Sequence, residues 1–417
     1  MNAEILTIGD ELLIGQTIDT NSAWIGKNLA LFGIQISRKT AISDSEKEII
    51  AAINEAFQRV DFLLVTGGLG PTKDDITKKT LAGFYNCGFR RNESVAAHLE
   101  NIFARRGRQL LEINKQQADV PEICEVLSNE VGTAPGMWFD QKGKVLVSMP
   151  GVPNEMVHIM ENRVFPRIKD RFKTPEILHC TAVTVGVPES LLCKQLEDFE
   201  KTLPPHIKLA YLPALNTVKL RLSGQSDDAA LLKAEMTGYF DNLCEVCGEA
   251  IFVREDISPV KYIARQLIHN KIKISLAESC TGGFIANQLV TESGISKVFN
   301  GSIISYANEI KHRELGVPNE IFSTVGAVSE KCARYMCEAA LKKFNADIAI
   351  STTGIAGPGG ATDEKPVGLI YIGVATAKGS RVKKYHLFGT REQFMQRAAN
   401  CAMMLVKDTL LQEFIVH

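Results

Sequence analysis

One stretch of the chain predicts its fold class: Ile272-Lys273-Ile274-Ser275-Leu276-Ala277-Glu278-Ser279-Cys280-Thr281-Gly282-Gly283-Phe284-Ile285-Ala286-Asn287-Gln288-Leu289. It begins as a short strand, passes through a loop of small polar residues and ends as a helix. This order places a serine hydroxyl, two glycines and the first amides of a helix beyond the carboxyl end of a strand, where an anion or an oxyanion can bind. Taken alone, the stretch is also typical of a tight turn in which Ser279 or Thr281 caps the helix.

The first 65 residues repeat the alternation of strand and helix patterns. We expect strands at Ala3–Ile8, Gln35–Thr40 and Phe62–Val65, and helices at Ser22–Leu31 and Glu46–Gln58. Alternating elements of this kind predict an α/β fold with a mostly parallel sheet covered by helices. Ligands of such sheets bind outside the carboxyl ends of the strands.

The last third of the chain has the same α/β alternation, and a long helix closes it. The expected strands and helices are Val260–His269, Ile272–Leu276, Gly301–Tyr306, Ser329–Phe344, Ile348–Thr352, Val367–Ala375, Arg381–Phe388 and Glu392–Phe414. Between the two α/β parts, a smaller α+β pattern has strands at Thr181–Val185, Lys208–Leu212 and Thr217–Leu222 and helices at Glu189–Phe199 and Asp227–Phe240. The chain is therefore expected to form three domains, at residues 1–170, 171–252 and 253–417.

The composition is that of a globular enzyme acting on small molecules. The 417 residues are 45% hydrophobic and 23% charged, which argues against disorder, and exceed what one compact core normally holds. A net charge of -1 gives no bulk attraction to nucleic acid or to anionic membranes. The N-terminus lacks a signal-peptide pattern and no apolar run has membrane-spanning length, so we expect a cytoplasmic protein with its ten cysteines reduced.

Two glycine-containing loops follow predicted strands near the N-terminus. They are Gly9-Asp10-Glu11-Leu12 and Thr66-Gly67-Gly68-Leu69-Gly70-Pro71-Thr72-Lys73-Asp74-Asp75. Glycines let a phosphate approach the backbone, and the carboxylates of Asp74 and Asp75 suit a hard divalent cation. The same carboxylates are also typical of the favourable charge in a first helical turn, and this applies equally to Glu155, a further metal candidate.

Four motifs of the last third together resemble the C-terminal domain of the CinA family of competence/damage-inducible proteins. They are Ala277–Gly283, Ser305–Lys311, Ser351–Gly360 and Glu364–Gly368. The stand-alone relatives of this domain are nicotinamide mononucleotide deamidases, so the resemblance implies a hydrolase that converts this nucleotide to nicotinic acid mononucleotide and ammonia in pyridine nucleotide salvage. It implies no cofactor for that step.

The resemblance assigns roles to matching residues. Ser279 corresponds to the nucleophile and Lys311 to its base, which requires that the lysine pKa fall from about 10.4 toward neutrality. Thr353 and Tyr306 complete the catalytic set. The implied substrate-binding residues are Glu278, Thr281, Gly282, Gly283, Asn308, Gly354 and Arg391, with the amides of Thr281–Gly283 or those near Gly354 as oxyanion donors. Cys280 remains an alternative nucleophile, because a thiol beside a base or a helix dipole ionises.

The N-terminal part resembles the molybdopterin-binding-like domain that opens full-length CinA proteins, and it is similar to MoaB and MogA. The motifs are Gly9–Glu11, Thr66–Asp75, Gly132–Gly136 and Met149–Met156. The resemblance implies a three-layer αβα domain with a metal-dependent ADP-ribose pyrophosphatase site. Its binding residues would be Thr66, Gly67, Gly68, Gly70 and Thr72, and its divalent metal ligands Asp74 and Asp75.

The middle segment corresponds to the domain of CinA proteins described as KH-like, but it has no Gly-x-x-Gly loop for a nucleic-acid backbone. We therefore expect small nucleotides as partners, neither nucleic acid nor membrane, and a homodimer from the family. Two departures concern phosphate binding: Thr390 stands where many members have aspartate, and Met395 where many have arginine. A protein that binds nucleotide or pterin without turnover, in a regulatory or scaffold role linked to competence or molybdenum cofactor metabolism, is the alternative function.

Overall fold

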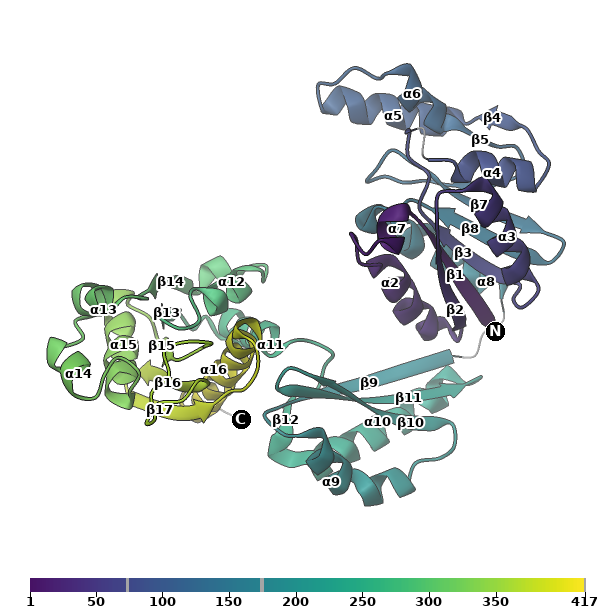
Figure 1. Cartoon of the computed structure of the whole chain (residues 1–417). Coiled ribbons are helices and arrows are strands. Elements are labelled where there is room, and N and C mark those ends of the chain that lie inside the picture. Colours follow the sequence, from purple (N-terminus) through teal and green to yellow (C-terminus); the bar gives the residue numbers. More distant parts are fainter. Residues whose placement is uncertain (73–74, 173–175, 416–417) are drawn as a thin grey trace. The chain divides into compact units, whose positions relative to one another are not determined.

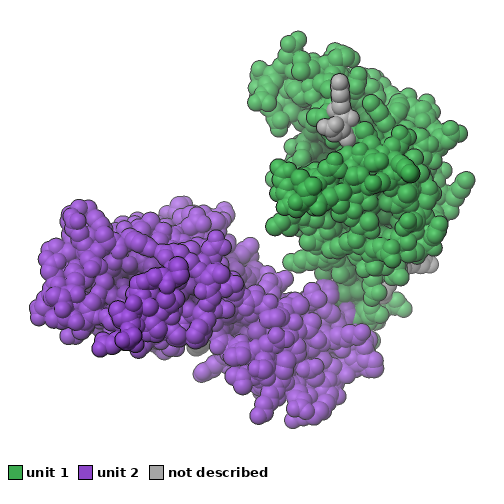
Figure 2. Space-filling model, in the orientation of Figure 1, with its two compact units in different colours: residues 1–178, 225–232 green, residues 179–224, 233–417 purple. Residues whose placement is uncertain are grey.

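The computed structural model describes residues 1–72, 75–172 and 176–415, which form two compact units (Figures 1 and 2). Unit 1 contains Met1–Leu178 and Gln225–Leu232, and unit 2 contains His179–Gly224 and Lys233–His417. The expected α/β class is confirmed. The domain boundaries at residues 170 and 252 stay a prediction.

The sheet of unit 1 has six strands in the order β2-β1-β3-β8-β7-β6. These strands are β1 (Asn2–Ile8), β2 (Gln35–Ile42), β3 (Phe62–Thr66), β6 (Glu125–Leu127), β7 (Gly136–Gln141) and β8 (Lys144–Met149). The pairs β1–β2, β1–β3 and β3–β8 are parallel, whereas β7 pairs antiparallel with β6 and β8. The mostly parallel sheet expected from the sequence is therefore present, with an antiparallel edge.

Both faces of this sheet carry an apolar core, because successive strand residues point to opposite faces. On β3, Phe62 and Leu64 belong to one core, which contains Ile25 of a helix, while Leu63 belongs to the other, which contains Ile53. Unit 1 is thus a three-layer αβα structure. Its helices are α1 (Asp10–Leu13), α2 (Thr20–Leu29), α3 (Glu46–Phe57), α4 (Thr77–Phe84), α5 (Glu93–Arg105), α6 (Glu112–Lys115), α7 (Pro153–Ile159) and α8 (Phe165–Arg171).

Short elements complete unit 1 beside α4. The strands β4 (Phe89–Arg91) and β5 (Asp119–Pro121) form an antiparallel pair, and the 3-10 turn η2 (Gln116–Ala118) immediately precedes β5. Two other short turns, η1 (Ala30–Phe32) and η3 (Met160–Val164), continue α2 and α7. The strands β4 and β5 and the turn η2 therefore lie together beside α4.

A four-stranded sheet in the middle of the chain has the order β10-β11-β9-β12. Its strands are β9 (Glu176–Val185), β10 (Ile207–Ala214), β11 (Thr217–Ser226) and β12 (Ile251–Val253), with helices α9 (Glu189–Lys201) and α10 (Ala229–Cys247) and the turn η4 (Gly248–Ala250). The predicted α+β pattern is present, and β9 begins five residues before its predicted start.

The C-terminal sheet has five strands in the order β14-β13-β15-β16-β17. They are β13 (Ile274–Glu278), β14 (Phe299–Ile304), β15 (Ile348–Gly354), β16 (Leu369–Thr376) and β17 (Gly379–His386). The strand β13 pairs parallel with both β14 and β15, so the carboxyl ends of these three strands lie at one edge. Motifs far apart in the sequence are brought together at this edge.

Helices cover both faces of the C-terminal sheet, as Figure 1 shows. Ile274 and Ile348 pack in the core on the side of Leu267 and Val406, whereas Ala277 packs in the opposite core. The helices are α11 (Pro259–Asn270), α12 (Phe284–Val290), α13 (Asn308–Leu315), α14 (Asn319–Thr324), α15 (Glu330–Lys343) and α16 (Arg391–Glu413), with the turn η5 (Ile295–Lys297). None of the described helices combines the length and apolar character that a bilayer crossing needs.

Candidate functional site

A cavity of about 240 Å³ lies beyond the carboxyl ends of β13, β14 and β15. Strand ends and the loops that follow them supply most of its lining, and the first turns of α13 and α16 and the segment before α15 supply the rest. Seven of the sequence-predicted residues line it: Ser279, Tyr306, Asn308, Lys311, Thr353, Gly354 and Arg391. The sequence spacing of these residues does not show whether they meet, and the fold brings them together at one cavity.

Ser279 is the first residue after β13, and its backbone is held by the neighbouring strand. Its amide donates a hydrogen bond to the carbonyl oxygen of Thr352 on β15 at 3.0 Å, and its own carbonyl oxygen accepts from the amide of Gly282 at 3.0 Å. The loop is thus closed on itself at the strand end. These two bonds fix the position of the Ser279 backbone. A fixed backbone is what a side chain needs if it is to act as a nucleophile.

Lys311 lies in α13 with a side chain that is only 2% exposed. Its Nζ donates to the backbone carbonyl oxygens of Ser305 at 2.7 Å and Tyr306 at 3.1 Å. Burial lowers the pKa of Lys311, because desolvation penalises the ammonium form, and the nearby thiols of Cys332 and Cys280 offset this only in part. The pKa shift has the direction that a general base requires.

Glu278 and Thr281 lie behind the loop and do not line the cavity. The side chain of Glu278 is fully buried, at 0% exposure. Its carboxylate accepts hydrogen bonds from Thr281 Oγ1 at 2.7 Å and from the amides of Gly283, Ile285 and Ala286 at 2.9 to 3.2 Å. It therefore satisfies the first amides of α12, which otherwise have no partner within the helix.

This arrangement engages two of the three amides expected as oxyanion donors at the start of α12. The amide of Gly283 donates to Glu278, and the amide of Gly282 donates to the carbonyl oxygen of Ser279. Both donors are therefore engaged inside the protein. Glu278, Thr281, Gly282 and Gly283 form the scaffold of the loop, and Gly354 remains beside the cavity.

At the cavity mouth, Arg391 joins two loops. It begins α16, and its guanidinium donates to the Tyr306 hydroxyl and to the carbonyl oxygen of Gly357, the latter at 3.0 Å. Thr353 lies deeper and donates through Oγ1 to the carbonyl oxygen of Ala327 at 2.8 Å. Positive charge and a phenol thus border the opening, while a threonine is fixed at its floor.

The two residues near Arg391 that depart from the family pattern, Thr390 and Met395, both have structural roles. Thr390 is the N-cap of α16, and it forms a capping box with Gln393. Threonine and aspartate can both cap a helix through a side-chain oxygen, so Thr390 supplies a cap that an aspartate could also provide. Met395 is partly buried against the C-terminal core and contributes packing in place of charge.

Cys280 also lines the cavity, but its surroundings oppose ionisation. The side chain is buried, and this raises the pKa of the Cys280 thiol to about 12. The Lys311 ammonium lowers that pKa only as a minor influence. Burial therefore disfavours the thiolate that Cys280 would need as a nucleophile.

A second cavity, of about 380 Å³, lies in unit 1 beside the start of α4. It is lined by Gly70, Pro71, Thr72, Asp75, Lys78, Lys79, Phe89, Ile113, Gln116, Gln117 and Asp119. Sequence reasoning identified the loop Gly70–Thr72 and Asp75, but it did not identify Lys78 or Gln117, because no motif marks them. Only the position of η2 next to α4 places Gln117 at this cavity.

Thr66, Gly67 and Gly68 do not line this second cavity, and the glycines have packing roles instead. A Cβ on Gly67 would lie 2.1 Å from the carbonyl oxygen of Ile8, and one on Gly68 would lie 2.1 Å from Thr77 Oγ1. Both glycines also have positive φ, at 107° and 66°. Close approach of the loop to β1 and α4 therefore requires glycine at these two positions.

The predicted metal ligands are only partly placed by the structure. Asp74 lies outside the described residues, and Asp75 Oδ2 accepts hydrogen bonds from the amide of Thr72 at 2.9 Å and from its hydroxyl. Glu155 accepts from Asn129 Nδ2 at 2.6 Å and does not line the cavity. Within residues 1–72, 75–172 and 176–415, no three acidic, histidine or cysteine side chains are grouped to hold a metal ion.

Carboxylates nevertheless gather near Asp75. The pKa of Asp44 is raised, first by burial and also by the charges of Asp10, Glu11 and Asp75. The amide of Asp10 donates to Asp44 Oδ2 at 3.2 Å. Among the residues that the structure describes, these carboxylates alone do not form a complete set of metal ligands.

Comparisons with known proteins give the family. Residues 257–410 match the model of the "CinA C-terminal domain", and residues 4–170 match that of the "Probable molybdopterin binding domain". A CinA-like protein of Cytophaga hutchinsonii is 44% identical and covers 98% of each chain. The chain belongs to the CinA family. The resemblance found in the motifs is therefore confirmed across nearly the whole sequence.

Two further similar proteins also have CinA in their names. A CinA-like protein of Chloroherpeton thalassium is 40% identical over 98% of this chain and 99% of its own. A solved structure of a CinA protein with unknown function from Thermoplasma acidophilum is 33% identical, with a TM-score of 0.36, and covers 40% of this chain and 96% of its own. These names do not state an activity or a substrate.

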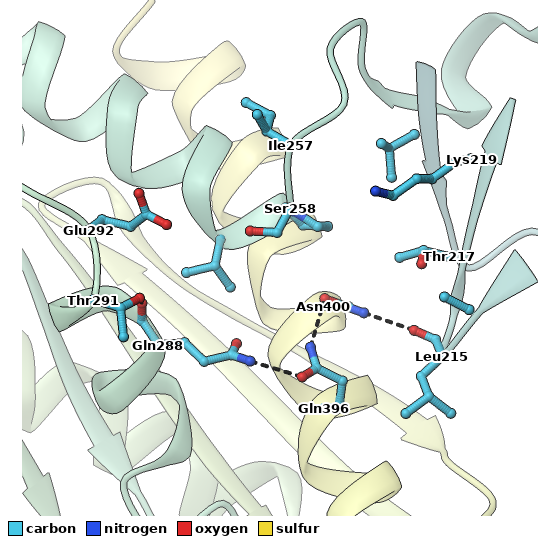
Figure 3. Close-up of a pocket in the computed structure, with 14 residues that line it drawn as sticks. Leu215, Thr217, Lys219, Ile257, Ser258, Gln288, Thr291, Glu292, Gln396 and Asn400 are labelled. Atoms are coloured by element: carbon cyan, nitrogen blue, oxygen red, sulfur yellow. Dashed lines mark hydrogen bonds between the residues drawn. The ribbon is translucent and has the colours of Figure 1, made fainter. Parts of the chain in front are cut away.

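A third cavity, of about 400 Å³, was not foreseen from the sequence (Figure 3). A row of side-chain amides borders it. Gln288 Nε2 of α12 donates to Gln396 Oε1 of α16 at 2.9 Å, and Asn400 Nδ2 donates to the carbonyl oxygen of Leu215 at 3.0 Å. Gln396 Nε2 lies 3.5 Å from Asn400 Oδ1 and completes the row. The helix after the Ser279 loop is thereby connected to the turn between β10 and β11.

Proposed function

We propose that this CinA protein is an amidohydrolase that converts nicotinamide mononucleotide to nicotinic acid mononucleotide and ammonia. The observation that carries the proposal is the shared cavity of Ser279 and Lys311, one at a rigid strand end and the other buried with a lowered pKa. The reaction needs no cofactor, because serine, lysine and water supply every atom and proton transferred.

In the proposed reaction, Ser279 Oγ attacks the carboxamide carbon of the nicotinamide ring, and Lys311 Nζ takes the hydroxyl proton. Collapse of the tetrahedral intermediate breaks the carbon–nitrogen bond, and Lys311 returns the proton to the leaving ammonia. Water then attacks the acyl ester, again with Lys311 as base, and releases the carboxylate and the Ser279 hydroxyl.

Binding of the substrate uses the groups around the mouth of the cavity. Arg391 is the cation available for the 5′-phosphate, and Tyr306 holds its guanidinium in place. Thr353 and Asn308 line the cavity where the carboxamide and ribose would lie, with the Thr281 amide or the backbone near Gly354 as the remaining source of oxyanion donors.

The experiment that tests this function is ammonia release from nicotinamide mononucleotide in EDTA. Wild type and Cys280→Ala are expected to be active, whereas Ser279→Ala and Lys311→Ala lose at least about 10³-fold in kcat. If the wild type released no ammonia while binding the nucleotide, the non-catalytic alternative would hold. Activity that needs Cys280 and not Ser279 would move the nucleophile to the thiol.

A second function is proposed for unit 1, where the cavity beside Gly70–Thr72 supports binding of a nucleotide diphosphate such as ADP-ribose. We propose metal-dependent pyrophosphatase activity, which EDTA should abolish and Asp75→Asn should lower. Persistence of full ADP-ribose cleavage in Asp75→Asn at saturating metal contradicts the role of that carboxylate.

The proposal also places the chain in the cytoplasm as a homodimer that acts on small nucleotides. Size-exclusion chromatography with light scattering tests the oligomeric state. A monomer at micromolar concentration contradicts the dimer and leaves the chemistry above unaffected.

A further inference from the structure

Gln117 is an unusual lining residue of the unit 1 cavity. Its side chain is only 3% exposed, yet neither Nε2 nor Oε1 has a hydrogen-bond partner among the residues that the structure describes. A buried carboxamide without partners costs free energy, so buried polar groups are nearly always paired. Gln117 lies in η2 directly before β5 and borders the cavity.

The other walls of this cavity suit a ring that carries a phosphate. Phe89 and Ile113 line it and are each 45% exposed, which leaves two apolar surfaces for a planar ring to contact. Lys78 and Lys79 supply positive charge beside the loop Gly70–Thr72. Apolar surface and cations thus line one space, and the buried, unpaired carboxamide of Gln117 lies within its wall.

The position of Lys78 supports an anionic ligand. Its Nζ donates to the carbonyl oxygen of Gln116 at 2.7 Å, so the side chain lies next to η2 and Gln117. Burial lowers the pKa of Lys78 to about 8, and the charge of Asp119 offsets this only in part. A phosphate in the cavity would favour the charged lysine and relieve this penalty.

We propose that Gln117 is a specificity-determining residue that reads the base edge of a purine nucleotide bound in the unit 1 cavity. A glutamine carboxamide presents one donor beside one acceptor, which matches the amino group and ring nitrogen of adenine in a bidentate pair. The inference rests on the proposed nucleotide site of unit 1 and adds a residue that no motif identifies.

The ligand pair AMP and purine riboside 5′-monophosphate tests this pairing. The second nucleotide lacks the exocyclic amino group, so it leaves Gln117 Oε1 without a donor and is otherwise the same size and charge. AMP has no diphosphate bond, so calorimetric titration of the full chain can include Mg²⁺. Excess nicotinic acid mononucleotide occupies the C-terminal cavity, which isolates the signal of unit 1.

Wild type should bind AMP about tenfold more tightly than purine riboside 5′-monophosphate, as expected for one hydrogen bond to a buried group. The Gln117→Leu variant should bind both nucleotides alike, with AMP weakened about tenfold. Because leucine removes an unpaired buried carboxamide, the melting temperature of the free protein should stay level or rise. A glutamine with a purely structural role would instead lower the melting temperature on replacement.

Three results overturn the inference. Equal affinity of the wild type for the two nucleotides shows that the amino group is not read, and this comparison needs no variant. Retained discrimination in Gln117→Leu assigns the reading to another residue. Absence of AMP binding by the wild type removes the nucleotide site itself, which separates failure of the proposed unit 1 function from failure of Gln117 alone.

Discussion

The Nζ of Lys311 lies 2.7 Å from the carbonyl oxygen of Ser305, to which it donates a hydrogen bond. Ser305 follows β14, so this bond fixes the lysine at the carboxyl end of a strand adjacent to the strand that carries Ser279. Carbonyl oxygens orient the ammonium group without adding a full negative charge. The site therefore holds the lysine in place while burial still lowers its pKa.

The first prediction concerns the pH dependence of ammonia release. Since Lys311 must be neutral to accept the serine proton, kcat/KM should rise with pH and level off above a pKa that lies below the ordinary lysine value of 10.5. Steady-state assays between pH 6 and 10 measure this. A profile that is flat over the whole range contradicts a lysine base.

The second prediction concerns stability. Because the folded-state pKa of Lys311 is lowered, the unfolded chain binds more protons between that pKa and 10.5. The free energy of unfolding of the wild type should therefore rise with pH in this window relative to Lys311→Met, and the difference should be constant below it. Urea unfolding at a series of pH values checks the sign. A difference that shrinks as pH rises would refute the lowered pKa.

The third prediction separates phosphate binding from chemistry at Arg391. Arg391→Ala should lower kcat/KM for nicotinamide mononucleotide about tenfold to a hundredfold, since a charge-assisted hydrogen bond is lost. Tyr306→Phe removes the hydroxyl that accepts from Arg391 and should have a smaller effect in the same direction. Nicotinamide riboside, which has no phosphate, is the matched control, and equal losses with this substrate argue against phosphate recognition.

The fourth prediction concerns Glu278, which we place in the loop scaffold. Glu278→Gln replaces one acceptor oxygen by a donor that faces backbone amides of α12 and should lower the free energy of unfolding by about 1–3 kcal/mol. Chemical denaturation measures the loss. Below the unfolding transition, KM for the nucleotide should change little, and a large rise in KM with unchanged stability would return Glu278 to the binding site.

The fifth prediction concerns the amide row beside the third cavity (Figure 3). Asn400 is buried and donates to the carbonyl oxygen of Leu215, so Asn400→Ala should cost about 1–3 kcal/mol by leaving that oxygen unpaired. Asn287→Ala, at an exposed position of α12, is the control and should cost far less. Equal costs for the two variants would mean that the Asn400 bond contributes nothing to stability.

Much of the fold followed from periodicity, because strands and helices depend on local patterns of apolar residues. Ile348–Thr352, for instance, was predicted as a strand and is observed as β15 (Ile348–Gly354). The positions of Ser279, Lys311 and Thr353 beyond strands or at helix starts followed from the same patterns. Their common cavity did not, since it depends on the pairing of β13 with β14 and β15.

The hydrogen bonds of the Ser279 loop could not be read from its motif. Glu278 and Gly282 belong to the motif of the Ser279 loop, but the Glu278 carboxylate accepts from amides at the start of α12, and the Gly282 amide donates to the carbonyl oxygen of Ser279. A sequence motif cannot distinguish a group that contacts a ligand from one that holds the loop. The close packing of Gly67 and Gly68 was likewise not predictable, because only the folded backbone shows which atoms a side chain there would meet.

The sequence by itself determined the α/β class, the order of the elements, the family and the identity of the serine and lysine, because these are written in local patterns and motifs. Only the tertiary structure decided which polar groups line a cavity and which are hydrogen-bonded within the protein. Lys311 gains its lowered pKa, and Gln117 its unpaired carboxamide, from burial by segments distant in the chain. Burial is a property of packing in three dimensions, and no stretch of residues contains it alone.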